Sequence, residues 1–141
     1  MSPKKTENKI HWTYGGEVID HVDKTPKGSF AFIYRITLDD GRYYLGKKYL
    51  WKPNYTKGIN KGKSKGVYPF QSYISSSVEL KALIKSGVKY KKEILFFTFS
   101  RAETTYRETK EILCSGALTD SNCLNYWVKA TIYARHLEPH T

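Results

Sequence analysis

A chain of 141 residues, 40% of them hydrophobic, is long enough for one domain with a buried core and too short for two. The formal net charge of +11 favours a polyanionic partner, and no stretch reads as a signal peptide or a membrane span. Two cysteines exclude a disulfide framework and favour an intracellular location with reduced thiols, such as the cytoplasm of a host cell.

The start of the chain differs from the rest in composition. Residues 1–9 are polar and basic and are predicted to be a flexible tail, and residues 10–141 are predicted to form the single domain. Residues 10–14 and 18–22 predict two short strands because they are rich in residues that favour strands. Residues 24–29 have the composition of a turn.

Residues 30–50 predict a β-hairpin. Two runs of Phe, Ile, Tyr and Leu flank Asp39-Asp40-Gly41, which suits a three-residue loop that ends in a left-handed glycine. This loop sets the pairing of the two strands, counted outward: Leu38 with Arg42, Ile36 with Tyr44, Tyr34 with Gly46 and Phe32 with Lys48. We therefore expect Tyr34, Tyr44 and Lys48 on one face, and the glycine opposite Tyr34 leaves space for a ligand beside its hydroxyl.

Most of the excess positive charge lies in one segment, residues 41–78, which contains eight Lys and Arg residues and no acidic residue. Within it, residues 51–71 form a long loop with interleaved aromatic rings, a composition that favours contact with phosphates and bases. The residues predicted to contact nucleic acid are Lys47, Lys52, Tyr55, Lys57, Lys61, Lys63, Lys65 and Tyr73. The alternatives are a solvated basic loop and aromatic rings that pin the loop onto the core.

Two helices and a strand are expected after this loop. Ser76-Ser77-Val78-Glu79 has the pattern of a capping box and predicts a helix over residues 77–86. Residues 89–99 alternate in polarity and predict a strand that is central in the sheet. A second capping box at residues 100–103 opens a helix that Gly116 would end.

The apolar side chains of this second helix are predicted to form one stripe at 100° per residue: Ala102, Tyr106, Thr109 and Leu113. Glu108 falls at the edge of the stripe, where it would face a cleft, whereas Glu111 would face water. A carboxylate at that border is placed to hold a divalent cation. The alternative for Glu108 is a solvated charge or an ion pair with a neighbouring arginine.

The tyrosine motifs resemble the GIY-YIG endonuclease family. Phe32-Ile33-Tyr34, nine further residues and Tyr44-Leu45-Gly46 are similar to its paired signature, with Phe in place of the first Gly and Leu in place of the second Ile. The likeness extends over residues 30–127. The Tyr-Ile-Ser-Ser-Ser run at residues 73–77 resembles a Tyr-x-Gly-Ser-Ser segment of the small phage-associated, SegE-like, homing-type branch.

The resemblance implies a fold of the α+β class, a small antiparallel sheet with flanking helices. It also implies a Mg²⁺- or Mn²⁺-dependent endonuclease that hydrolyses double-stranded DNA, site-specific, of the homing or phage-interference type, by nicking or by double-strand cleavage. By motif position, Tyr34 would be the general base, Tyr44 would line the site, Glu108 would bind the metal and Asn125 would support the cleft.

The arginine that the family usually carries on the helix after its second motif is missing in this sequence. The predicted pairing of the hairpin places Lys48 on the same face as the tyrosines, which makes it the candidate for the catalytic contact to phosphate. Lys47 and Lys52 are the alternatives if the strand bulges. The serines at residues 75–77 resemble the family's segment, or they only cap the helix.

Two other classes of function stay open. One is a basic nucleic-acid-binding module without catalysis, and the other is a protein that binds an acidic protein partner. Neither accounts for the joint placement of Tyr34, Tyr44 and Glu108. A zinc site is disfavoured because its cysteines are widely spaced and its last histidine is next to the end of the chain; its ligands would be Cys114, Cys123, His136 and His140. No basic amphipathic helix points to a membrane surface.

Overall fold

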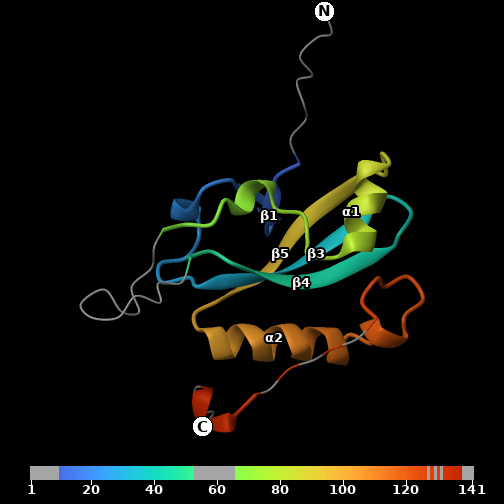
Figure 1. Cartoon of the computed structure of the whole chain (residues 1–141). Helices are drawn as coiled ribbons and strands as arrows, with labels where there is room; N and C mark the ends of the chain where they lie inside the picture. The colour runs from blue at the N-terminus through green and yellow to red at the C-terminus, as the bar shows by residue number, and fades with distance from the viewer. Residues whose placement is uncertain (1–9, 53–65, 127, 129, 131, 138–141) are drawn as a thin grey trace, which may run out of the picture.

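The computed structural model describes residues 10–52, 66–126, 128, 130 and 132–137, which build a sheet between two helices (Figure 1). The strands are β1 (Trp12–Tyr14), β2 (Glu17–Ile19), β3 (Ala31–Leu38), β4 (Tyr43–Tyr49) and β5 (Tyr90–Thr98). The helices are α1 (Val78–Lys85) and α2 (Arg101–Cys114). Short 3₁₀ turns cover Val22–Lys24, Phe70–Ser72, Ala117–Thr119 and Ala134–His136.

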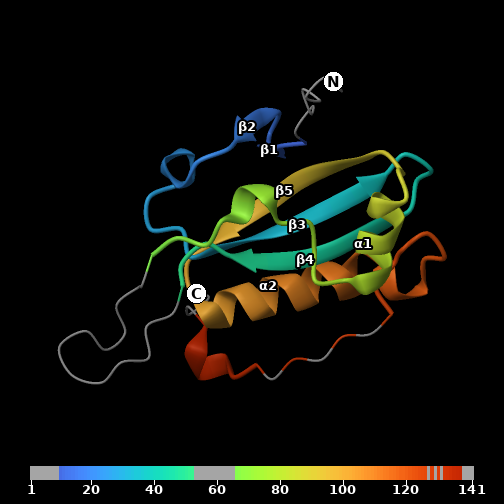
Figure 2. The ribbon, with the colours of Figure 1, turned by 45° about the horizontal axis from the view of Figure 1, so that its top comes forward.

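The five strands form one sheet in the order β2-β1-β5-β3-β4. Neighbouring strands are antiparallel except β1 and β5, which run parallel. The expected α+β class and the central position of β5 are therefore confirmed, and the parallel pair is an addition to the antiparallel sheet that the sequence predicts. Strand β4 lies at one edge of the sheet (Figure 2). Its outer side has no neighbouring strand of the sheet, so other segments can contact β4 there as well as on its two faces.

The β3–β4 hairpin has the register that its loop predicts. Tyr34 pairs with Gly46 and Ile36 with Tyr44, and the Leu38 N–H donates to the Arg42 carbonyl over 2.7 Å. The loop glycine, Gly41, has a φ of 94°, the left-handed conformation that favours glycine. Tyr34 and Tyr44 consequently share one face, with ring centroids 6.4 Å apart.

The two faces of the sheet carry separate hydrophobic clusters. The larger cluster lies on the face that α1 covers, and it contains Trp12, Phe32 and Tyr34 together with Leu80 of α1. The smaller cluster joins Leu45 of β4 to Ile112 and other residues on the side of α2. Figures 1 and 2 show the two helices on opposite faces of the sheet, so residues that alternate along β4 point towards different helices.

The predicted N-cap of the first helix is wrong by one residue. Ser77, not Ser76, is the N-cap of α1, and its hydroxyl accepts a hydrogen bond from the Leu80 N–H over 3.2 Å. Glu79 therefore occupies the second helical position, too early to reach back to the cap, and its carboxylate accepts a hydrogen bond from Tyr126 over 2.6 Å. The N-cap of α2 is Ser100, as expected.

The buried stripe of α2 also differs from the prediction. Thr104 and Ile112 are its buried residues, whereas Leu113 is 55% exposed. A polar contact sets the phase of the helix, because the Thr104 hydroxyl bonds to that of Thr98 on β5 over 2.7 Å. Glu108 lies one turn from both Thr104 and Ile112, so the stripe that packs on the sheet runs through it. None of the helices in the described part of the chain has the length and apolar character needed to span a membrane.

Candidate active site

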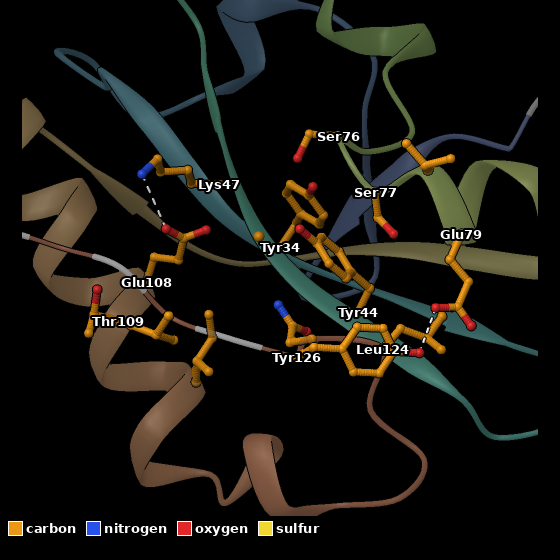
Figure 3. A pocket seen from close by; sticks show the side chains of 15 residues that line it. Tyr34, Tyr44, Lys47, Ser76, Ser77, Glu79, Glu108, Thr109, Leu124 and Tyr126 are labelled. Atoms are coloured by element: carbon orange, nitrogen blue, oxygen red, sulfur yellow. Dashed lines mark hydrogen bonds and ion pairs between the residues drawn. The ribbon is translucent and has the colours of Figure 1, made fainter.

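A pocket of about 530 Å³ wraps around the edge strand β4 and receives side chains from both faces of the sheet (Figure 3). Tyr34 and Tyr44 line it from the α1 face. Lys47 lines it from the opposite face, where Glu108 of α2 lies against it. Such a convergence is possible only at a sheet edge, because inner strands separate the two faces completely.

The tyrosine phenols lie deep in the pocket. Tyr34 is fully buried, and its hydroxyl has no hydrogen-bond partner among the described residues. Burial and the neighbouring phenol of Tyr73 raise the pKa of Tyr34 well above its ordinary value. Burial also raises the pKa of Tyr44, and the Glu108 carboxylate adds to that effect. Both phenols are therefore neutral at neutral pH in the absence of a bound cation.

Gly46 is required by the close approach of Tyr34. A Cβ on Gly46 would lie 2.5 Å from the Tyr34 Cζ, well inside a normal contact, and still closer to the hydroxyl oxygen. The space beside Gly46 is thus filled by the phenol itself, which corrects the expectation that a ligand would use it. Tyr34 itself lines the pocket.

Replacing Gly46 with Ala is expected to lower the free energy of unfolding by about 1–3 kcal/mol, because the added methyl group overpacks a filled core. Urea unfolding measures this loss. In a Tyr34→Leu background the same substitution should cost less, since the ring that it meets is gone. Equal losses in the two backgrounds would show that the contact with Tyr34 does not cause the effect.

Glu108 faces the pocket, as the sequence predicts, and forms an ion pair with Lys47. The Lys47 Nζ lies 3.2 Å from the Glu108 Oε1, and the two side chains are 31% and 21% exposed. Partial burial makes this pair stronger than a fully solvated one. The carboxylate is thus held at the pocket wall with a cation already beside it.

Asn125 binds the open edge of β4 in the manner of a neighbouring strand. Its side-chain oxygen accepts from the Leu45 N–H and its amide nitrogen donates to the Leu45 carbonyl, both over 2.9 Å. Next to it, the Leu124 N–H donates to the Tyr43 carbonyl. Asn125 is 8% exposed and fixes the part of β4 that carries Tyr44 and the glycine of the motif.

Lys48 is not brought to the pocket. Its Nζ lies 4.1 Å from the ring centroid of Tyr68 and 4.5 Å from that of Tyr73. The pairing of the hairpin places Lys48 on the tyrosine face, as expected. The two rings nevertheless hold its ammonium by cation–π attraction, and burial lowers the pKa of Lys48. Tyr73 is half-buried and packs edge-on against Tyr34, with ring centroids 5.9 Å apart.

The remaining predicted contacts to nucleic acid are only partly described. Lys52 is exposed and its N–H donates to the Gly66 carbonyl. Five of the predicted residues lie outside the described residues: Tyr55, Lys57, Lys61, Lys63 and Lys65. His140 of the zinc alternative does so too, and no three His, Cys, Asp or Glu side chains gather as a metal cluster within the described ranges.

Several residues that line the pocket are not among the predicted site residues. Ser76 and Ser77, for which the sequence leaves a family segment or a helix cap open, both line it. Glu79 of α1 and Tyr126, which follows α2 in the chain, line it too and were missed. Outside the pocket, Lys92 was also missed. It is a buried lysine of β5 that donates to the carbonyls of Gln71 and Tyr73 and so fixes the segment that precedes α1. Burial lowers the pKa of Lys92 to about 8.

Comparison with known protein families gives a match over most of the chain. Residues 12–131 match the SegE GIY-YIG family model, described as "Putative endonuclease segE, GIY-YIG domain". The matched range contains Tyr34, Tyr44, Glu108 and Asn125. No curated protein and no solved structure gives a significant match to the chain.

Proposed function

Because the chain belongs to the SegE-like GIY-YIG family, and is therefore a DNA endonuclease that hydrolyses phosphodiester bonds, we propose that the pocket around β4 is its active site. The observation that carries this proposal is the convergence of Tyr34, Tyr44 and Glu108 on one pocket from opposite faces of an edge strand. We further propose that the substrate is double-stranded DNA, cut at specific sites as a homing or phage-interference enzyme does.

The donor atoms of the pocket fit a magnesium or manganese ion. Glu108 offers a carboxylate, and serine, threonine and tyrosine hydroxyls line the same pocket. Mg²⁺ is commonly held by one or two carboxylates, with water and substrate phosphate as its other ligands. The ammonium of Lys47 is already paired with this carboxylate, so a bound metal ion would displace it or share Glu108 with it. When bound, the metal would neutralise negative charge that develops on the phosphate and on the leaving oxygen.

Tyr34 is the proposed general base. Its hydroxyl is buried and has no partner in the described part of the chain, and Tyr34 lines the pocket, so a small shift of the ring or of the pocket wall would let a water molecule or a phosphate bind it. A phenol must lose its own proton before it can accept one from water, and positive charge in the pocket lowers the pKa that burial raises. Tyr44 would orient the phosphate or the attacking water, and Asn125 would position β4 through Leu45.

A plasmid assay tests the proposed function. We expect supercoiled plasmid to be converted to the open circular form with Mg²⁺ or Mn²⁺ and to stay intact with EDTA, because one pocket hydrolyses one strand at a time. A plasmid that stays intact with every metal while its migration is still retarded in a gel would instead identify a binding module without catalysis. Loss of both activities would favour an acidic protein partner.

A further inference from the structure

An active site for phosphodiester hydrolysis needs a group that binds phosphate. The lysine of this pocket is not free for that role. Lys47 is the only Lys or Arg among the described residues that line the pocket, and it is paired with Glu108. Lys48 is held between aromatic rings outside it. A phosphate in the pocket would therefore need other hydrogen-bond donors, on the side of the pocket that carries the phenols.

The N-terminus of α1 forms that wall. Ser76, Ser77, Val78 and Glu79 all line the pocket. The hydroxyl of Ser77 caps the Leu80 N–H and the Ser77 carbonyl accepts from Lys81, but the N–H groups of Val78 and Glu79 have no hydrogen bond within the described part of the chain. Free N–H groups and the helix dipole make such an end attractive to anions.

The turn before the helix holds these donors in place. Ser75 is buried, and its hydroxyl accepts a hydrogen bond from the Ser77 N–H over 2.8 Å. The exposed Ser76 side chain interacts with the Tyr44 phenol, so it already lies beside the rings of the pocket. The carboxylate of Glu79, the one negative group of this turn, accepts a hydrogen bond from Tyr126. These hydrogen bonds therefore fix the start of α1, whose first residues line the pocket.

A second and independent feature of the same pocket calls for a ligand. The Tyr34 hydroxyl is buried and forms no hydrogen bond of normal geometry with a described residue, although Tyr73 and Ser75 lie near it, and a buried hydroxyl without a partner is unfavourable unless a bound group satisfies it. In Figure 3 the two phenols lie between Glu108 on one side and Ser77 on the other, with Ser76 beside the rings. A phosphate at the phenols would meet the serines directly.

We propose that the N-terminus of α1 is a phosphate-binding subsite, in which the hydroxyls of Ser76 and Ser77 and the N–H groups of Val78 and Glu79 bind non-bridging oxygens. Its ligand is a phosphate diester of the DNA backbone, next to the Tyr34 hydroxyl. That identity rests on the proposed function, whereas the affinity for a phosphate group does not. The subsite supplies by hydrogen bonds what a free arginine or lysine would supply by charge.

Two substitutions of Ser77 separate anion binding from helix capping. Aspartate and asparagine both cap helices well, so Ser77→Asp and Ser77→Asn should preserve α1 and the thermal melting temperature. Only aspartate puts a negative charge against a bound phosphate. Ser121→Asp is the matched control for charge, because Ser121 is exposed and does not line the pocket.

The test follows the backbone N–H signals of Val78 and Glu79 by NMR in EDTA while inorganic phosphate is added. Wild type and Ser121→Asp should show saturating shifts of these two signals. Ser77→Asn, which loses the hydroxyl but keeps the cap, should show the same shifts at a higher phosphate concentration, and Ser77→Asp should show none. Fluorescence anisotropy with a short duplex in EDTA should show about a tenfold weaker affinity for Ser77→Asp than for Ser121→Asp. Absent or unsaturable shifts in the wild type, or equal shifts in Ser77→Asp, would overturn the subsite.

Failure of the proposed function gives a different result. A protein whose Val78 and Glu79 signals respond to phosphate, but which leaves plasmid intact with every metal, would keep the subsite and lose the nuclease assignment. A protein that cuts plasmid and shows no response would lose the subsite alone.

Discussion

Replacing Glu108 with Gln is expected to reduce single-turnover cleavage of DNA by about 10²–10³-fold or more, while DNA binding in EDTA stays close to that of the wild type. The amide keeps the shape of the side chain but loses the charge that the proposed cation requires. It also releases the Lys47 ammonium from its ion pair, so the pocket does not become less attractive to DNA. Cleavage of supercoiled plasmid with enzyme in excess measures the effect.

Glu111→Gln is the matched control for that experiment. Glu111 lies on the same helix, is half-buried and does not line the pocket. Its substitution should leave the cleavage rate within about twofold. Cleavage by Glu108→Gln at the wild-type rate would remove Glu108 from the proposed site.

Tyr34→Phe should lower the same rate by about 10²–10⁴-fold, the usual contribution of a general base. The fold should tolerate the change, because the ring remains in the core and the lost hydroxyl has no partner among the described residues. Thermal melting checks the fold and single-turnover cleavage checks the chemistry. Tyr90→Phe removes a hydroxyl from a half-buried ring that does not line the pocket, and this variant should cut normally.

The pH profile of cleavage gives the same prediction a second readout. Burial raises the pKa of Tyr34, so below that pKa the fraction of ionised phenol grows about tenfold per pH unit. The wild-type rate should therefore rise from neutral to alkaline pH, and the Tyr34→Phe rate should not. A neutral Tyr34 favours the folded state below the unfolded pKa of about 10, and this contribution is lost as pH rises further, so assays below pH 10 leave the fold intact. A wild-type profile that Tyr34→Phe leaves unchanged would exclude Tyr34 as the base.

The local features of the fold could be predicted from the sequence, and the long-range ones could not. Asp39-Asp40-Gly41 determines the register of the hairpin because loop length and a left-handed glycine fix which residues pair. The parallel pairing of β1 with β5 joins residues about eighty positions apart, such as Trp12 and Lys92. A strand of three residues carries no pattern that distinguishes parallel from antiparallel partners.

The candidate site shows the same division. Strand parity correctly places Tyr34 and Tyr44 on one face. The same alternation points to Lys48 instead of Lys47, because it considers only the residues on one face of the sheet. The pocket passes around the edge of β4, however, and Lys47 reaches it from the other face. Glu108 faces the pocket although the predicted apolar stripe was wrong, since the contact between Thr98 and Thr104 sets the rotation of α2.

The carboxamide of Asn125 also bears on how copies of this chain behave at high concentration. An open sheet edge is a template onto which another polypeptide can add, the first step towards strand-exchanged dimers and fibrils. Asn125 occupies both backbone groups of Leu45, so a foreign segment cannot form a continuous ladder along β4. One side chain thereby blocks strand addition at this point of β4, without an extra strand that would cover the pocket.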